Sequence, residues 1–135
     1  MNKCISEKII YLVLFFVFPS EVFSGDFKKT LIFHQKQEEL IDNGAVSQTY
    51  IFNLDGDRAF LKIKSWHSLY SCDGSYIVTN VNGVITLSWD ALVNKKKYFC
   101  SSPSPQFKIK NEGNGFYLNG HVLIDENEWY LMTEK

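Results

Sequence analysis

Three histidines, His34, His67 and His121, are the side chains of this chain best suited to act as general bases or metal ligands. Nucleophilic catalysis would pair such a base with an activated serine or cysteine, but no serine stands in a G-x-S-x-G turn. The sequence also contains no H-E-x-x-H motif, no C-x-x-C motif and no glycine-rich phosphate loop. An enzyme would need one of the histidines to meet carboxylates in a cleft, and the spacing does not indicate this. We therefore predict a non-enzymatic protein without a metal or a cofactor.

The carboxylate pairs do not indicate catalysis either. Neighbouring carboxylates at positions 38–39 and 125–126 are adjacent in sequence, where side chains usually diverge into solvent. Asp55 and Asp57 flank Gly56, and aspartate at such a place favours turn geometry. A calcium loop would need more oxygen ligands at defined spacing. We interpret these residues as surface and turn residues.

Cysteine chemistry is the clearest signal in the body of the chain. Cys72 and Cys100 follow Tyr70 and Tyr98 by two positions, in segments with the composition of β-strands. An even number of cysteines in an oxidising compartment indicates a disulfide. The alternatives are two buried thiols, or a metal site for which no further ligands are nearby. We predict a Cys72–Cys100 bridge.

Residues 1–24 have the pattern of a secretory signal peptide, which explains that oxidising compartment. An unbroken apolar run occupies positions 9–18, and residues 22–24 (VFS) place small side chains before a cleavage point at Gly25. The run has about half the length that a membrane-spanning helix needs, so we expect no permanent anchor. Removing it also removes Cys4, which precedes the apolar run and so does not form a lipid-attachment site.

The predicted mature chain, residues 25–135, has the size of one domain. The net charge is −1 with or without the leader, so we expect no nucleic-acid partner. The one dense basic run, Lys95-Lys96-Lys97, is typical of a solvated loop. The sequence contains no N-x-S/T sequon, which weakly favours a bacterial protein in the periplasm or outside the cell.

Two aromatic segments are the candidate binding sites. Trp66, His67 and Tyr70 lie between the two clearest hairpins and directly before Cys72, in a connection of the kind that often carries function. The alternative is that these aromatics pack on the disulfide as part of the core.

Trp129 and Tyr130 form a similar pair near the C-terminus. In a regular strand one of the two side chains faces away from the core.

The elements that would position these residues are short strands. Residues 76–89 alternate apolar and polar side chains around Asn82-Gly83, the pair preferred in a type I′ hairpin turn. This turn predicts that Tyr76 faces Trp89 and that Val78 faces Leu87, on the core side of the sheet.

A second predicted hairpin joins residues 48–54 to residues 58–65. With Asp55-Gly56 as the turn, Phe52 would face Ala59 and Tyr50 would face Leu61.

Further strands are expected at residues 30–33, 106–110, 116–118, 121–124 and 128–132, with Asn119-Gly120 as another turn. Residues 101–105 contain two prolines and should form an exposed connection. Residues 35–41 are expected to form a short helix that ends at Asn43-Gly44.

Together these patterns predict an all-β domain of about eight short antiparallel strands in sequence order. It would form a meander barrel or a sandwich, with at most one short helix near the mature N-terminus and one disulfide. The leading function is docking of a protein partner, as inhibitor- or immunity-type proteins do. The alternative is a carrier of a small apolar ligand with a lipocalin-like cavity, and an open or a filled interior separates the two.

Overall fold

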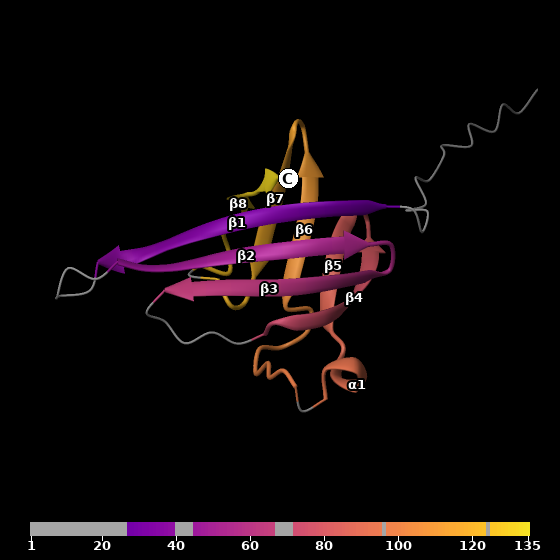
Figure 1. The fold of residues 1–135 in the computed structure, drawn as a ribbon. Coiled ribbons are helices and arrows are strands. Elements are labelled where there is room, and N and C mark those ends of the chain that lie inside the picture. The colour runs from indigo at the N-terminus through magenta and orange to yellow at the C-terminus, as the bar shows by residue number, and fades with distance from the viewer. Residues whose placement is uncertain (1–26, 40–44, 67–71, 96, 124) are drawn as a thin grey trace, which may run out of the picture.

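The described residues form a nearly closed antiparallel barrel of nine strands with one short helix (Figure 1). A computed structural model describes residues 27–39, 45–66, 72–95, 97–123 and 125–135. The predicted signal peptide lies outside these residues. The strands are β1 (Lys28–Glu39), β2 (Ala45–Asp55), β3 (Arg58–Trp66), β4 (Gly74–Val81), β5 (Val84–Trp89), β6 (Phe107–Glu112), β7 (Gly115–Gly120), β8 (Tyr130–Leu131) and β9 (Thr133–Glu134), and the helix is α1 (Ala91–Asn94).

Each of the first seven strands pairs with the next one along the chain, so the predicted meander is confirmed. The C-terminal segment then brings the two ends of the sheet together. In this segment β8 pairs with β7 through Leu118 and Tyr130, whereas β9 pairs with β1 through Leu31 and Glu134. Between them, the Met132 N–H donates to the carbonyl of Phe116 at 2.9 Å. The segment formed by β8 and β9 therefore pairs with β7 and with β1, and it covers strand edges that would otherwise be exposed.

The core is formed by the inward-facing side chains of alternate positions on every long strand. Four large aromatic side chains are fully or almost fully buried, and Phe107 lies among the other three. Its ring centroid is 5.1 Å from that of Phe52, 5.8 Å from Tyr76 and 6.2 Å from Tyr50. In Figure 1, β1–β3 run across β5–β7, so the two groups of strands face each other through this cluster. Phe107 therefore packs against aromatic side chains of β2 and β4 in the interior.

The β4–β5 hairpin has the predicted register throughout. Tyr76 pairs with Trp89, and Val81 pairs with Val84. Asn82 and Gly83 have φ values of 52° and 82°, as a type I′ turn requires. The Asn-Gly pair was sufficient because few other residues adopt two successive positive φ angles.

The predicted register of the β2–β3 hairpin is wrong by two positions. Asp55 pairs with Arg58, so the turn consists of Gly56 and Asp57. Gly56 has φ 61°, and positive φ at the first turn residue is what a type II′ turn requires. Because the shift is even, every side chain keeps its predicted face, and Phe52 lies opposite Leu61 rather than Ala59.

The predicted helix at residues 35–41 is also wrong, as far as the described residues reach. β1 continues to Glu39, and Gln35 pairs with Gln48 with both side chains buried. Pairing along the whole of β2 outweighs the local helix preference of this polar segment. The observed helix is α1, beyond the middle of the chain.

Asn119-Gly120 is not a turn, since β7 continues to Gly120 and residues 121–123 form no strand. A Cβ at Gly120 would lie 2.7 Å from the carbonyl oxygen of Gln106. Glycine therefore permits two backbone segments of the chain to approach closely here. The Asn119 side chain donates to the carbonyls of Glu126 and Glu128 at 2.6 and 2.8 Å. The pair that resembles a hairpin turn therefore holds a strand end against the following loop.

Candidate functional site

The predicted disulfide joins Cys72 to Cys100. It connects the residues before β4 to the segment that follows α1, with a Cα–Cα distance of 4.3 Å. Two hydrogen bonds surround it: the Cys72 N–H donates to the carbonyl of Phe99 at 2.8 Å, and the Tyr76 hydroxyl donates to the carbonyl of Cys72 at 2.5 Å. The bridge therefore fastens the α1 segment to the barrel wall.

The two predicted aromatic sites have different outcomes. Trp66 is the last residue of β3, but its side chain, His67 and Tyr70 lie outside the described residues. Trp129 precedes β8 and Tyr130 begins it, and their side chains have different neighbours. Tyr130 packs on the core, with its ring centroid 5.1 Å from that of Phe33, whereas the Trp129 ring lies 4.4 Å from the Lys110 ammonium. A binding role for these residues stays a prediction.

The two described histidines have separate partners. His34 Nδ1 lies 2.7 Å from the Thr49 hydroxyl, and His121 Nδ1 lies 2.9 Å from a carboxylate oxygen of Glu126. Within the described parts of the chain, no three histidine, cysteine or acidic side chains are grouped so that they could hold a metal ion.

Polar side chains are gathered at one end of the barrel interior. The Tyr50 hydroxyl donates to Gln48 at 2.7 Å, and the Ile63 N–H donates to Asp73 at 3.0 Å. Burial, together with the Asp73 carboxylate, raises the pKa of Tyr50 to about 12. Burial also raises the pKa of Asp73. Both raised pKa values mean that burial disfavours the charged form of the side chain, so Tyr50 stays neutral in this cluster.

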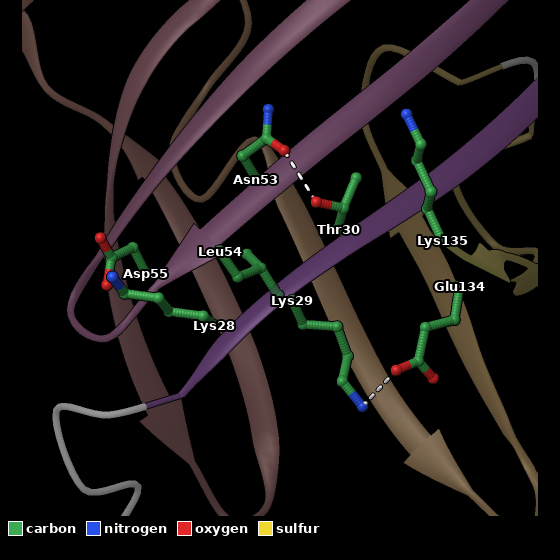
Figure 2. Close-up of a pocket in the computed structure, with 8 residues that line it drawn as sticks. All are labelled: Lys28, Lys29, Thr30, Asn53, Leu54, Asp55, Glu134 and Lys135. Atoms are coloured by element: carbon green, nitrogen blue, oxygen red, sulfur yellow. Dashed lines mark hydrogen bonds and ion pairs between the residues drawn. The ribbon is translucent and has the colours of Figure 1, made fainter.

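Two hollows on the outer surface are lined by described residues. The first, of about 410 Å³, lies where β1, β2 and β9 meet, and Figure 2 shows its lining residues. Here the Lys29 ammonium pairs with Glu134 at 2.9 Å and lies 4.5 Å from the ring centroid of Phe116 on β7. The Thr30 hydroxyl donates to Asn53 at 2.9 Å. These contacts join β1 to its neighbours, so this hollow belongs to the closure of the barrel.

The second hollow, of about 460 Å³, is here named the outer groove. It lies on the outer face of β3 and β4, with α1 as one wall. Its lining residues are Asn53, Asp55, Arg58, Ala59, Phe60, Ser75 and Val93. Phe60 and Val93 are both exposed and apolar, and charged side chains lie beside them. This combination of an apolar centre and a charged rim is typical of a recognition surface.

The α1 wall of the groove is held by charged and polar contacts. Asp90 caps the helix by accepting from the Val93 N–H at 3.2 Å, and it forms an ion pair with Arg58. The bond from Val93, followed by the bonds from Arg58, lowers the pKa of Asp90. Asp90 is therefore a carboxylate at neutral pH, where both contacts need its charge.

Asn94 anchors the end of the same helix to β4. Its side-chain amide donates to the carbonyl of Ser75 at 2.9 Å and accepts from the Ser75 N–H at 2.8 Å. The Asn94 side chain is buried, and a Cβ at Gly74 would lie 2.5 Å from its oxygen. α1 therefore has one fixed position on the barrel.

Beyond the groove, α1 and the segment after it form a protrusion, here named the lysine-flanked tip and defined by Leu92, Lys95, Lys97 and Phe99. Leu92 is 81% exposed and Phe99 is 72% exposed. In Figure 1, α1 and this segment lie below the strands, at the opposite end from the turn between β6 and β7.

Sequence reasoning did not identify α1 or the tip. Asp90 followed by A-L-V was a usable capping signal for a helix start. Asn94 and Gln106 carried no such signal, although both are buried, and Gln106 accepts from the Trp89 N–H at 2.8 Å. Their roles depend on strands that are distant in sequence.

Comparisons with known proteins found no matching family model, no matching curated protein and no matching solved structure. No helix in the described part of the chain is long and apolar enough to cross a membrane.

Proposed function

We propose that this chain is an exported, non-enzymatic binding protein that docks a protein partner through the outer groove, as inhibitor- or immunity-type proteins do. The observation that carries the proposal is the groove itself. Phe60 and Val93 present apolar surface between charged side chains, and Phe60 is steadied by the Tyr98 ring at a centroid distance of 6.0 Å. Aromatic anchors within a polar rim account for much of the binding energy in known protein interfaces.

The rigid frame of the groove supports this function. Two of its walls are paired strands, and the third is α1, which Asp90 and Asn94 hold in one position. A surface that does not rearrange loses little conformational entropy on binding, which favours tight association.

The interior of the barrel supports surface recognition over the carriage of a small apolar ligand. A carrier would need a cavity of a few hundred Å³ enclosed by its inward side chains. Here, the Phe107 ring packs against both Phe52 and Tyr76 in the interior. The outer groove, by contrast, is open to solvent and accessible to a large partner.

The disulfide supports export to the periplasm or to the outside of the cell, together with the predicted leader at residues 1–24. Structural disulfides form and persist in such oxidising compartments. We infer a bacterial source from the absence of sequons in the sequence, which weakly favours it.

The test compares variants of the mature chain as bait in exported fractions of the source organism. Phe60→Asp places a charge at the centre of the groove, and Val93→Ser removes the apolar side chain that α1 contributes to it. Val81→Asp is the matched control, because Val81 is an exposed apolar residue at the β4–β5 turn. We expect one protein that wild type and Val81→Asp capture, that both groove variants lose, and that forms a stoichiometric complex when purified.

Capture of the same proteins by all four forms, or of none by wild type, would overturn the proposal. Thermal unfolding of each variant checks that the barrel is intact.

A further inference from the structure

The lysine-flanked tip presents apolar side chains that the groove does not use. Leu92 and Phe99 are the two most exposed large apolar side chains in the described part of the chain. They come from two different elements, α1 and the segment that ends at Cys100. Neither lines either of the two hollows described above, and both project outward instead. Large exposed apolar side chains on a protruding part of the chain indicate an interaction surface.

The fold holds both side chains in this exposed position. Asn94 fastens α1 to Ser75 through two hydrogen bonds of 2.8 and 2.9 Å. Phe99 is held by its neighbour Cys100 through the disulfide, and by the hydrogen bond from the Cys72 N–H to its carbonyl. The exposure of the tip is therefore imposed by specific contacts rather than by fraying of a loop.

The charge within the tip segment has one sign. Residues 91–100 contain three lysines and no aspartate or glutamate, although the whole chain has a net charge of −1. Lys95 and Lys97 are exposed and stand between Leu92 and Phe99 in the sequence. The nearest preceding carboxylate, Asp90, is already paired with Arg58. The tip thus combines protruding apolar side chains with two exposed lysines.

We propose that the lysine-flanked tip binds peripherally to a bilayer that contains anionic phospholipid. Leu92 and Phe99 enter the boundary between headgroups and acyl chains, and Lys95 and Lys97 contact the lipid phosphates. Charge complementarity and shape favour this occupant. A bilayer interface accepts convex apolar side chains without a matching pocket, and basic residues next to them add attraction to anionic lipid. This inference goes beyond the proposed function, because it uses a different surface.

The test is cosedimentation of the mature chain with vesicles of phosphatidylcholine, with and without about 30% phosphatidylglycerol. We expect binding to the anionic vesicles only, and weaker binding as the salt concentration rises. Replacing Lys95 and Lys97 by serine should lower the apparent affinity by about five-fold for each lysine. Leu92→Ser with Phe99→Ser should lower it by at least about ten-fold, since two apolar side chains no longer leave water.

The matched control is Val81→Ser with Leu131→Ser, which removes two exposed apolar side chains far from the tip along the chain and should leave vesicle binding unchanged. Phe60→Asp should also bind vesicles like wild type, so failure of the groove proposal and failure of the tip proposal are distinguishable. All variants are compared at matched thermal stability with the disulfide formed.

The proposal is overturned if wild type stays in the supernatant, or if the tip variants sediment as wild type does. It is also overturned if the tip variants lose a captured protein in exported fractions while wild type ignores both vesicle types. That result would assign the tip to a protein interface.

Discussion

The apolar side chains inside the barrel and those at the lysine-flanked tip are held in place by opposite means. Inside, Phe107 lies among Phe52, Tyr50 and Tyr76 because alternate positions of paired strands point to one side of the sheet. At the tip, Leu92 and Phe99 stay in solvent because polar contacts and a disulfide hold the backbone beneath them.

This difference separates residues that stabilise the fold from residues that are available for binding. Loss of an interior ring leaves a cavity, so stability should fall. Loss of a tip side chain removes little buried area, so stability should be kept while an interaction is lost. The predictions below test this separation, from the largest expected effect on stability to the smallest.

Phe107→Ala should lower the free energy of unfolding by about 3–5 kcal/mol, because it empties the centre of the aromatic cluster. Equilibrium unfolding in urea measures the change. Since small domains are stable by only about 5–15 kcal/mol, this variant should be close to unfolding at physiological temperature. Phe107→Leu, which keeps most of the volume, should retain the larger part of the stability. An Ala variant as stable as wild type would contradict a filled interior.

Replacing both Cys72 and Cys100 by serine should lower stability by about 3–4 kcal/mol, since the bridge closes a loop with a sequence separation of 28. Wild type under reducing conditions should match the variant in a denaturant titration. We also expect the double variant to lose vesicle binding, because Phe99 is no longer held. Unchanged stability on reduction would show that the loop is ordered without the bridge.

Asn94→Ala should lower the free energy of unfolding by about 1–3 kcal/mol, because it leaves the N–H and carbonyl of Ser75 without the Asn94 side chain as their partner. Hydrogen exchange of the amides in α1 should accelerate more than exchange in β2. Asn111→Ala, at an exposed position near the end of β6, is the control and should change neither quantity. Equal acceleration in both elements would mean that Asn94 supports the whole barrel rather than the tip.

Alkaline pH should destabilise the interior through Tyr50. Burial raises the pKa of Tyr50 from its ordinary 10.0 to about 12 in the folded state, while the unfolded state ionises at the ordinary value. The contribution of the neutral Tyr50 side chain to the free energy of unfolding is complete below pH 10 and is lost as the pH rises toward 12. At pH 11 the free energy of unfolding is lower by about 1 kcal/mol. Tyr50→Phe should reduce this loss of stability with pH, measured by denaturant titrations at increasing pH. A loss equal to that of wild type would argue against a buried phenol.

Phe99→Ser should change the free energy of unfolding by no more than about 0.5 kcal/mol, the range of ordinary surface substitutions. Combined with Leu92→Ser it should still abolish most vesicle binding. A loss of stability as large as that of Phe107→Ala would remove the distinction between the interior and the tip.

The two hairpins show how far local sequence signals reach. For β4–β5, Asn82-Gly83 defines both the turn and the register, and the pairing of Tyr76 with Trp89 follows directly. For β2–β3, Gly56 can serve as either the first or the second turn residue, and local signals do not decide between the two. In the structure, Gly56 is the first turn residue. Asp55 therefore pairs with Arg58, and the register differs from the predicted one by two residues.

What the sequence determined by itself was the set of inward faces, the all-β class, the meander order and the disulfide. These depend on alternation, on turn residues and on one pair of cysteines, which are local or countable features.

Only the tertiary structure decided where the chain closes and what it exposes. Closure depends on β8 and β9, which are too short to signal a strand alone and form because β7 and β1 each offer an edge. Gln35 lies in a strand rather than in a helix because β2 pairs with it. The tip exists because Asn94 reaches the backbone of Ser75, 19 residues earlier. Each of these outcomes is a contact between distant segments, and local propensity carries no information about such contacts.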